Sequence, residues 1–183
     1  MYHASHTLLQ VPQISQVSIF ASNAEVMEFV PQNCTFVQRD VSLDSDETLG
    51  HQIYRAFAEQ CPADIYVLAH ATSPFLQAST VERMIQEVES GNFDSSATVE
   101  LLQTYCWFGG RPLNFTSDHR GRTQDLEPIV RETSGCYVFS RGDALQGKRL
   151  GIRPYLHQCQ LPESIDIDEA REWTLSEMFA DRL

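Results

Sequence analysis

Residues 64–69 place five apolar side chains in a row behind a single aspartate (D-I-Y-V-L-A). An apolar run without polar alternation is typical of a strand that is buried on both faces. Such a strand needs helices on both sides of its sheet, and segments with helical apolar spacing flank it at 46–60 and 79–88. Further strands are expected at 15–21, 35–37, 95–102 and 136–139, and further helices at 22–30 and 169–181. This alternation predicts an α/β fold with a doubly wound, mainly parallel sheet.

We expect a single domain over residues 1–183, because a chain of this length can bury a full core and no linker or repeat interrupts it. The stretch 105–127 differs from the rest, since Gly109, Gly110, Pro112 and Gly121 divide it into short extended pieces. We interpret it as an excursion from the sheet that is suited to a dimer contact. The longest apolar runs are too short to cross a bilayer, so we expect no membrane partner.

The net charge of −12 argues against a nucleic-acid partner, which needs clustered basic residues to neutralise phosphates. Residues 111–153 nevertheless hold eight basic against five acidic residues, and twelve of the thirteen basic residues in the chain are arginines. The arginine fork fits a carboxylate or a phosphate, which favours a small anionic ligand. A solvated surface with scattered ion pairs would explain the same cluster.

The cysteine content indicates a reducing compartment. None of the five cysteines forms a C-x-x-C pair, and the N-terminus lacks the basic and long apolar regions of a secretory signal. We therefore expect a cytoplasmic location.

Residues 163–169 (E-S-I-D-I-D-E) alternate acidic and apolar side chains. In an extended segment, Asp166 and Asp168 would share one face and Ile165 and Ile167 the other. Two neighbouring carboxylates repel each other unless a cation lies between them, and hard oxygen ligands suit Mg²⁺. Alternatively, Asp168 is the N-cap of the helix that follows.

The strand at 64–69 is followed by H-A-T-S-P-F at 70–75. In open α/β sheets, ligands bind beyond the carboxyl ends of the strands. Thr72 and Ser73 would offer hydroxyls and backbone N–H groups there, although a strand-to-helix turn with two polar residues is the simpler interpretation.

Four segments in order resemble the motifs of the acylneuraminate cytidylyltransferase family, the CMP-sialic acid synthetases and their relatives. They are H-A-T-S-P-F at 70–75, T-Q-D-L-E-P at 123–128, E-T-S-G-C-Y-V-F at 132–139 and S-I-D-I-D at 164–168. The family has Q-P-T-S-P-L-R, R-Q-D-L-P, N-G-x-x-Y and S-I-D-I-D in the same order. Arg39, four residues before the Leu43 of L-D-S-D, is similar to the start of the family's R-P-x-x-L-x-x-D stretch.

The resemblance implies a nucleotide-diphospho-sugar transferase-like fold and an enzyme that joins CMP from CTP to an acidic sugar, sialic acid or a related one, with release of pyrophosphate. It also implies a homodimer and Mg²⁺ as the cofactor. By the same resemblance, Asp166 and Asp168 would be catalytic and hold the metal. The nucleotide and the sugar would be bound by Arg39, His70, Thr72, Ser73 and Gln124.

The sequence departs from the family's pattern in ways that bear on activity. Family members begin with a strand and a basic glycine-rich loop, I-P-A-R-G-G-S-K, whereas residues 1–9 resemble the helix after that loop. The first strand and the phosphate loop are therefore expected to be missing. His70 replaces a glutamine, Leu76 an arginine, and Thr123 the arginine before Gln-Asp-Leu. These departures leave open a non-catalytic homologue that acts as a binding or dimer partner, and a transferase for another base or a neutral sugar.

Overall fold

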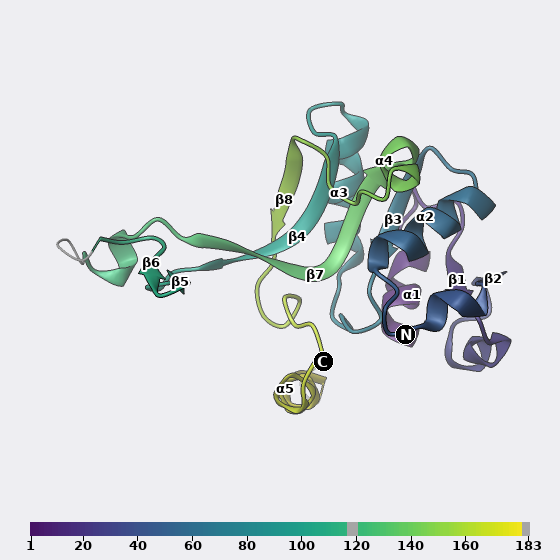
Figure 1. Ribbon diagram of the computed structural model, residues 1–183. Helices are drawn as coiled ribbons and strands as arrows, with labels where there is room; N and C mark the ends of the chain where they lie inside the picture. The colour runs from purple at the N-terminus through teal and green to yellow at the C-terminus, as the bar shows by residue number, and fades with distance from the viewer. Residues whose placement is uncertain (117–120, 181–183) are drawn as a thin grey trace.

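This computed structural model describes residues 1–116 and 121–180 (Figure 1). The helices are α1 (Tyr2–Leu9), α2 (Gly50–Gln60), α3 (Ala78–Glu89), α4 (Arg141–Leu145) and α5 (Ala170–Ala180), with 3₁₀ turns η1 (Ala24–Phe29), η2 (Val41–Asp44) and η3 (Thr123–Asp125). The strands are β1 (Ser18–Ala21), β2 (Thr35–Gln38), β3 (Ile65–Ala69), β4 (Ser95–Leu102), β5 (Trp107–Phe108), β6 (Arg111–Pro112), β7 (Ile129–Ser140) and β8 (Pro154–Gln158).

The central sheet has the strand order β3-β7-β4-β8. β7 runs antiparallel to both β3 and β4, and β8 runs parallel to β4, so β3, β4 and β8 share one direction. β1 and β2 form a separate parallel pair. The predicted α/β fold with a doubly wound, mainly parallel sheet is confirmed, with β7 as the antiparallel strand.

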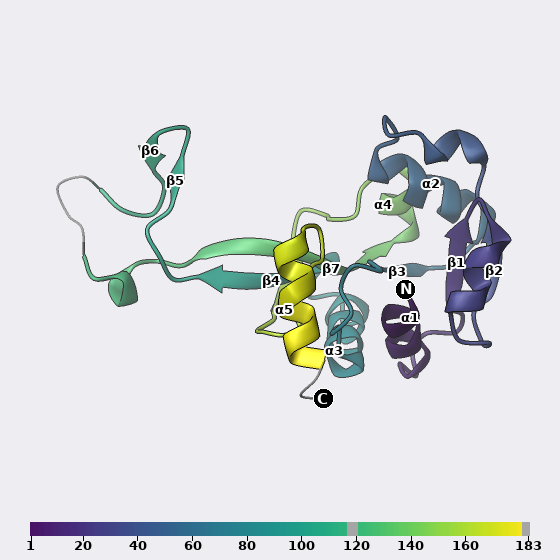
Figure 2. The ribbon, with the colours of Figure 1, turned by 90° about the horizontal axis from the view of Figure 1, so that it is seen from below.

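Helices cover both faces of this sheet, as the apolar run in β3 predicts. Figure 2 shows α2 and α4 on one side of the strands and α1 and α3 on the other. On the α3 side, Val81, Met84 and Ile85 pack with Cys136 and Val138 of β7. On the α2 side, a second cluster joins the helices to the alternate residues of the same strands, namely Ala58, Tyr66, Ala97, Tyr137, Phe139 and Ala144. Each strand residue therefore contributes to one of two cores.

The sheet is interrupted between β1 and β3. Among the described residues, β1 pairs only with β2 and β3 only with β7, so each has one edge without a strand partner. Phe57 of α2 spans this interruption, because its ring contacts both Phe20 of β1 and Tyr66 of β3. Apart from Tyr66, the residues of β3 remain partly exposed although helices cover both faces. The open edge accounts for that exposure.

Residues 105–116 and 121–127 form an arm that extends away from the sheet, as Figure 1 shows. β5 and β6 pair within it, and the ends of β4 and β7 connect it to the body. Residues 117–120 of the predicted excursion lie outside the described residues. Trp107 and Phe108 on the arm are 56% and 79% exposed, so it presents apolar rings to its surroundings.

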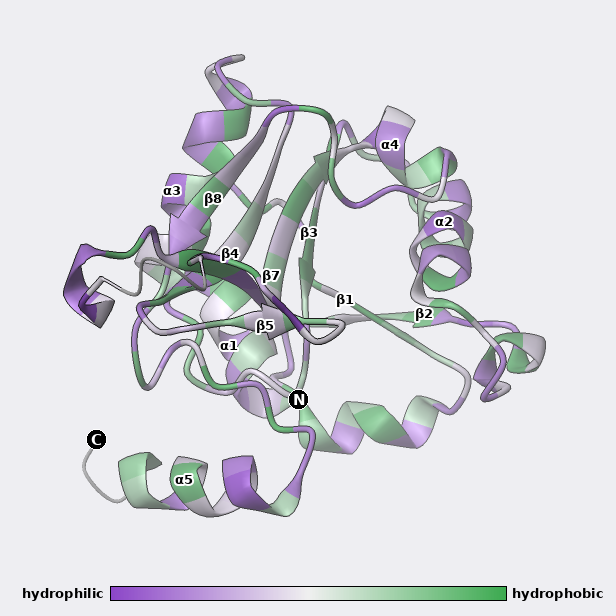
Figure 3. Cartoon of the chain, turned by 60° about the vertical axis from the view of Figure 1, so that its left-hand side comes forward, coloured by the Kyte–Doolittle hydropathy of each residue, from purple (hydrophilic) through white to green (hydrophobic). Residues whose placement is uncertain are grey.

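Several element boundaries differ from the sequence-based expectation. The helix expected over 46–60 begins only at Gly50. The residue before it, Leu49, donates its N–H to the side-chain oxygen of Gln52. The helix expected over 22–30 is the 3₁₀ turn η1, capped by Asn23. The expected strand 136–139 is the end of the much longer β7. Helices α2, α3 and α5 carry both hydrophilic and hydrophobic residues, as Figure 3 shows. None of the helices among the described residues has the length and apolar content needed to span a bilayer.

Candidate active site

The turn after β3 and the segment 163–169 are fixed against each other. The backbone N–H of Ile167 donates a hydrogen bond of 2.9 Å to the carbonyl of Thr72. A carboxylate oxygen of Glu163 accepts from the N–H of Gln77, the residue before α3, at 3.0 Å. Ile165 is buried between these two attachments. The segment therefore lies at the carboxyl end of β3, where ligands bind in open α/β sheets.

A bulge in β7 forms the opposite wall. The pairing of β4 with β7 shifts register between Ala97 and Val99, and Ser134 takes a φ of 60°, which is rare for a residue other than glycine. The next carbonyl, that of Gly135, accepts from the N–H of His70 at 3.1 Å. A bulge is a common device for redirecting side chains beside functional sites.

Gly135 leaves room for the turn. A Cβ at this position would lie 3.3 Å from both Ser73 Oγ and Thr98 Oγ1. Thr98 is part of a buried hydrogen-bond network. Its hydroxyl oxygen accepts from the hydroxyl of Thr133 at 2.8 Å and from the N–H of Cys136 at 3.0 Å. The turn and the bulge are thus packed closely enough to hold a fixed geometry.

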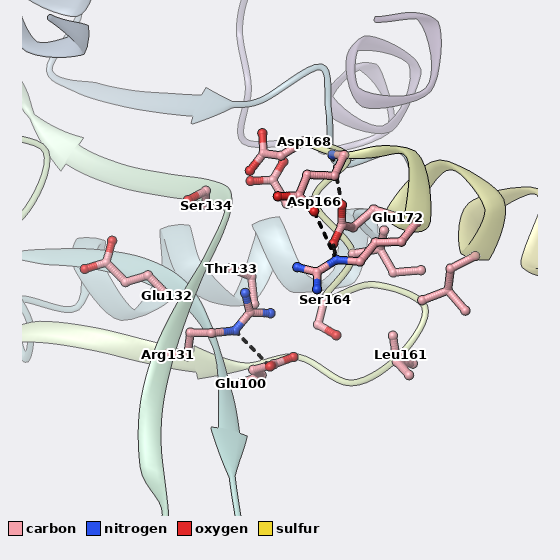
Figure 4. Close-up of a pocket in the computed structure, with 14 residues that line it drawn as sticks. Glu100, Arg131, Glu132, Thr133, Ser134, Leu161, Ser164, Asp166, Asp168 and Glu172 are labelled. Carbon is pink, nitrogen blue, oxygen red and sulfur yellow. Dashed lines mark hydrogen bonds and ion pairs between the residues drawn. The ribbon is translucent and has the colours of Figure 1, made fainter. Parts of the chain in front are cut away.

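An open cavity of about 340 Å³ lies between the bulge and the start of α5. Figure 4 shows Asp166 and Asp168 at its edge, on the side of Ser134, with Glu132 further along β7. Two arginines on the rim are engaged by glutamates: Arg131 Nε lies 2.9 Å from Glu100 Oε1, and Arg171 Nε lies 2.6 Å from Glu172 Oε1.

Asp166 and Asp168 have the donor chemistry for a hard cation. Oδ1 of Asp166 is buried and has no hydrogen-bond partner among the described residues. A buried carboxylate oxygen without a partner is costly unless a cation or proton satisfies it. In residues 1–116 and 121–180, however, no group of three or more His, Cys, Asp or Glu side chains is arranged to hold a metal. The two carboxylates fit Mg²⁺ when it takes its other oxygens from water or a phosphate.

His70 lies beside these carboxylates. Burial lowers the pKa of His70 below its ordinary value, Asp166 and Asp168 oppose that shift, and the guanidinium of Arg149 adds to it. The imidazole therefore favours its neutral form, in which it both donates and accepts a hydrogen bond.

Tyr137, Glu132 and Arg149 form a linked group near His70. The hydroxyl of Tyr137 donates to Glu132 Oε2 at 2.7 Å, and the guanidinium carbon of Arg149 lies 4.2 Å from the centre of the Tyr137 ring. The ring of His70 is 6.1 Å from that of Tyr137. Burial, with the bond to Glu132, raises the pKa of Tyr137 to about 12, so the phenol stays neutral.

The structure brings together some of the residues that the sequence singles out and separates others. Asp166 and Asp168 line the cavity, and His70 and Thr72 lie in the turn that holds their segment. Ser73 is buried with its hydroxyl against Gly135, so it does not line the cavity. Arg39 is bound to Asp44 at the end of β2, at 2.6 Å.

Gln124 lies on the arm, and α5 begins two residues after Asp168. Gln124 belongs to η3 on the arm, next to the grey trace in Figure 1. Helix α5 begins at Ala170, and the residue before it is Glu169, whose N–H donates to the Glu172 side chain and whose carbonyl accepts from the N–H of Trp173. Asp168 therefore does not serve as the N-cap, and the cap interpretation is wrong.

Sequence reasoning assigned no role to Ser134, Tyr137 or Arg149. Tyr137 stands in one of the four quoted segments, but nothing in its spacing indicates a partner. Arg149 is one of many arginines in a basic stretch. The positive φ of Ser134 depends on the bulge, which strand periodicity does not show.

A family model described as Cytidylyltransferase matches residues 1–113 of this chain. The search of curated proteins gave no match.

Solved structures with the same fold include a CMP:2-keto-3-deoxy-manno-octonic acid synthetase complexed with CTP. It has a TM-score of 0.68 and 14% identity, over 99% of this chain and 87% of that one. A 4-diphosphocytidyl-2C-methyl-D-erythritol synthase matches with a TM-score of 0.60 and 12% identity, over 98% and 87% of the two chains. The corresponding synthase from Anaerococcus prevotii matches with a TM-score of 0.63 and 8% identity, over 97% and 84%.

Proposed function

The chain belongs to the cytidylyltransferase family of nucleotidyltransferases, and we propose that it joins CMP from CTP to an acidic sugar and releases pyrophosphate. The observation that carries the proposal is the cavity at the carboxyl end of β3. The hydrogen bond from Ile167 to Thr72 holds two carboxylates there, beside the turn that follows the strand.

Asp166 and Asp168 would hold Mg²⁺ against the triphosphate. The buried, unpartnered Oδ1 of Asp166 supports this assignment. When bound, the metal would neutralise charge on the departing pyrophosphate. A transfer of this kind needs little covalent chemistry from the protein, which has only to align the sugar hydroxyl with the α-phosphorus.

Three residues beside the cavity would bind and orient the substrates. The neutral imidazole of His70 would hydrogen-bond a substrate hydroxyl. Ser134, turned toward the cavity by its bulge, would offer a hydroxyl from the opposite wall. Thr72 would lie next to the nucleotide, because its carbonyl fixes the carboxylate segment.

Two observations support an acidic sugar as the acceptor. The order of the four sequence motifs suggests it, and a solved synthetase of the same fold is described as acting on a sugar acid. Sialic acid itself is one candidate among several such acids.

The test is Mg²⁺-dependent release of pyrophosphate from CTP in the presence of a sugar acid. We expect Asp166→Asn and Asp168→Asn each to lower the rate by about a hundredfold or more, as the loss of transition-state charge stabilisation does in other enzymes. Glu177→Gln, which removes an exposed carboxylate from α5, is the matched control and should keep the wild-type rate.

Two further measurements separate this proposal from its alternatives. Calorimetric titration with CTP and Mg²⁺ that shows binding without turnover would favour a non-catalytic binding homologue. Equal rates with all four nucleoside triphosphates would remove the preference for cytidine. Full activity in both aspartate variants would remove the metal assignment.

We also propose that the arm pairs with a second copy of the chain. Its exposed Trp107 and Phe108 form an apolar surface of the kind that marks protein contacts. A homodimer would bring Gln124 of the arm to the cavity of the partner, since Gln124 is not among the residues that line the cavity of its own chain.

A further inference from the structure

Arg149 differs from the other arginines near the cavity in how it is bound. Arg131 and Arg171 each lie within hydrogen-bond distance of a glutamate, at 2.9 and 2.6 Å. Arg149 comes no closer than 3.6 Å to Glu132, which is too long for a hydrogen bond. Its guanidinium is instead placed over the ring of Tyr137. Stacking fixes the plane of the guanidinium and leaves its N–H groups available at the edge.

The loop that carries Arg149 is fixed on both sides. Before it, the N–H of Lys148 donates to the carbonyl of Asp143 at 2.8 Å. After it, the N–H of Gly151 donates to Ser95 Oγ at 2.8 Å, and the N–H of Arg153 donates to Asp94 Oδ2 at the same distance. A donor held in place before the ligand arrives loses little entropy on binding.

The surroundings of Arg149 suit an anion and connect it to the cavity. Glu132, which lines the cavity, already places a carboxylate 3.6 Å from the guanidinium. His70 is influenced by the charges of Arg149, Asp166 and Asp168, so the guanidinium and the two carboxylates all lie near the same imidazole. A ligand held between them would have a cation site at one end and a guanidinium at the other.

We propose that Arg149, stacked on Tyr137, binds the carboxylate of the acceptor sugar. This inference rests on the proposed function and names the residue that makes the enzyme select an acidic acceptor. The uncharged ring of Tyr137 packs against the face of the guanidinium and adds no charge to the site. When the sugar binds, its carboxylate becomes the anion nearest to Arg149 in place of Glu132. Glu132 keeps the hydrogen bond that it accepts from the Tyr137 hydroxyl.

The experiment compares a charged and a neutral form of one ligand. Binding of 2-keto-3-deoxy-manno-octonic acid and of N-acetylneuraminic acid, each as the free acid and as its methyl ester, is measured by calorimetry in the presence of CTP and Mg²⁺. We expect Arg149→Gln to weaken binding of the acid by about tenfold to a hundredfold, the range that loss of a charge-assisted hydrogen bond produces. Binding of the ester and of CTP should stay within about twofold of wild type, because neither interaction uses this charge.

Two variants make the result specific. Lys148→Gln removes a positive charge from the neighbouring position of the same loop, where the side chain is exposed and bonds only to Gln146 among the described contacts. It should bind the acid as wild type does. Arg149→Lys keeps the charge but loses the planar fork, and should fall between wild type and Arg149→Gln.

The outcomes that overturn the inference are distinct from those that overturn the function. If Arg149→Gln binds the acid as tightly as wild type, or weakens acid and ester equally, Arg149 does not read the carboxylate, and the proposed reaction stands. If the wild-type protein binds CTP but binds acid and ester alike, the acidic acceptor itself is wrong and the inference falls with it.

Discussion

The lowered pKa of His70 has a consequence for stability at acidic pH. Because burial disfavours the charged ring in the folded protein, the unfolded chain binds a proton at this position more readily. The stability that neutral His70 contributes is complete above its unfolded pKa of about 6.5 and is lost as the pH falls from there toward the lower folded pKa.

We therefore expect the free energy of unfolding to fall between about pH 7 and pH 5 more steeply in the wild-type protein than in His70→Gln. Urea unfolding at a series of pH values measures both slopes. His3→Gln, at an exposed position in α1, is the control and should follow wild type. Parallel curves for wild type and His70→Gln would show that the buried ring does not control this pH range.

For individual residues, the sequence shows which side chains could bind a ligand or a metal, but not which of them contact one another in the folded protein. The burial of Ile165 agrees with the two-residue period, but Ile165 lines the same cavity as Asp166 and Asp168, because the segment is not a regular strand with two opposite faces. The contact of Arg149 with Tyr137 joins a loop to a strand, and no period in the sequence encodes it. The carbonyl of Thr72 holds the carboxylate segment, whereas the hydroxyl of Ser73 packs against Gly135.

Among the elements, the strand β3 and helices α2 and α3 could be predicted because their apolar patterns are continuous. The sequence pattern indicates β7 only over 136–139, since the polar residues Arg131, Glu132 and Thr133 break the apolar pattern of a buried strand. Those residues lie beside the cavity or in the buried threonine network. Their polar side chains suit that position but interrupt the apolar pattern by which a strand is predicted from sequence.

Helix α5 has few buried contacts with the rest of the protein. Ser176 is the one buried residue in it, and Trp173 is 57% exposed. The rings of Phe179 and Phe75 meet edge to face at 6.4 Å, which links the helix to the turn after β3. An element with so few buried contacts opens locally at low free energy.

We expect Phe179→Ala to raise the rate of tryptic cleavage after Arg171 by about threefold to tenfold, because an aromatic pair contributes about 0.5–1.5 kcal/mol. Cleavage is followed by mass spectrometry under native conditions. Met178→Ala changes the neighbouring exposed residue and should leave the rate unchanged. An equal rise in both variants would mean that the ring contact does not hold the helix.

For the whole molecule, the exposed aromatic residues of the arm bear on self-association of the chain. We expect Phe108→Ser to weaken self-association by about tenfold or more, as the loss of a central aromatic contact does in other interfaces. Sedimentation equilibrium measures the change, and thermal unfolding should be unaffected because Phe108 is 79% exposed.

Phe29→Ser provides the comparison for this test. It makes the same substitution at an exposed phenylalanine of η1, away from the arm. It should leave the association constant as it is in wild type. A wild-type chain that is monomeric at every accessible concentration, or equal effects of the two substitutions, would remove the arm as the site of pairing.

β7 is continuous from the base of the arm at Ile129, through Glu132 and the bulge at Ser134, to the core residue Phe139. The same strand therefore forms the stem of the arm and one wall of the cavity, and its far end is fixed in the core. Any tilt of the free end must either displace the Glu132 side chain or be absorbed by the irregular backbone at Ser134. If the arm pairs with a second copy as proposed, assembly would reach the wall of the cavity through this one strand of twelve residues.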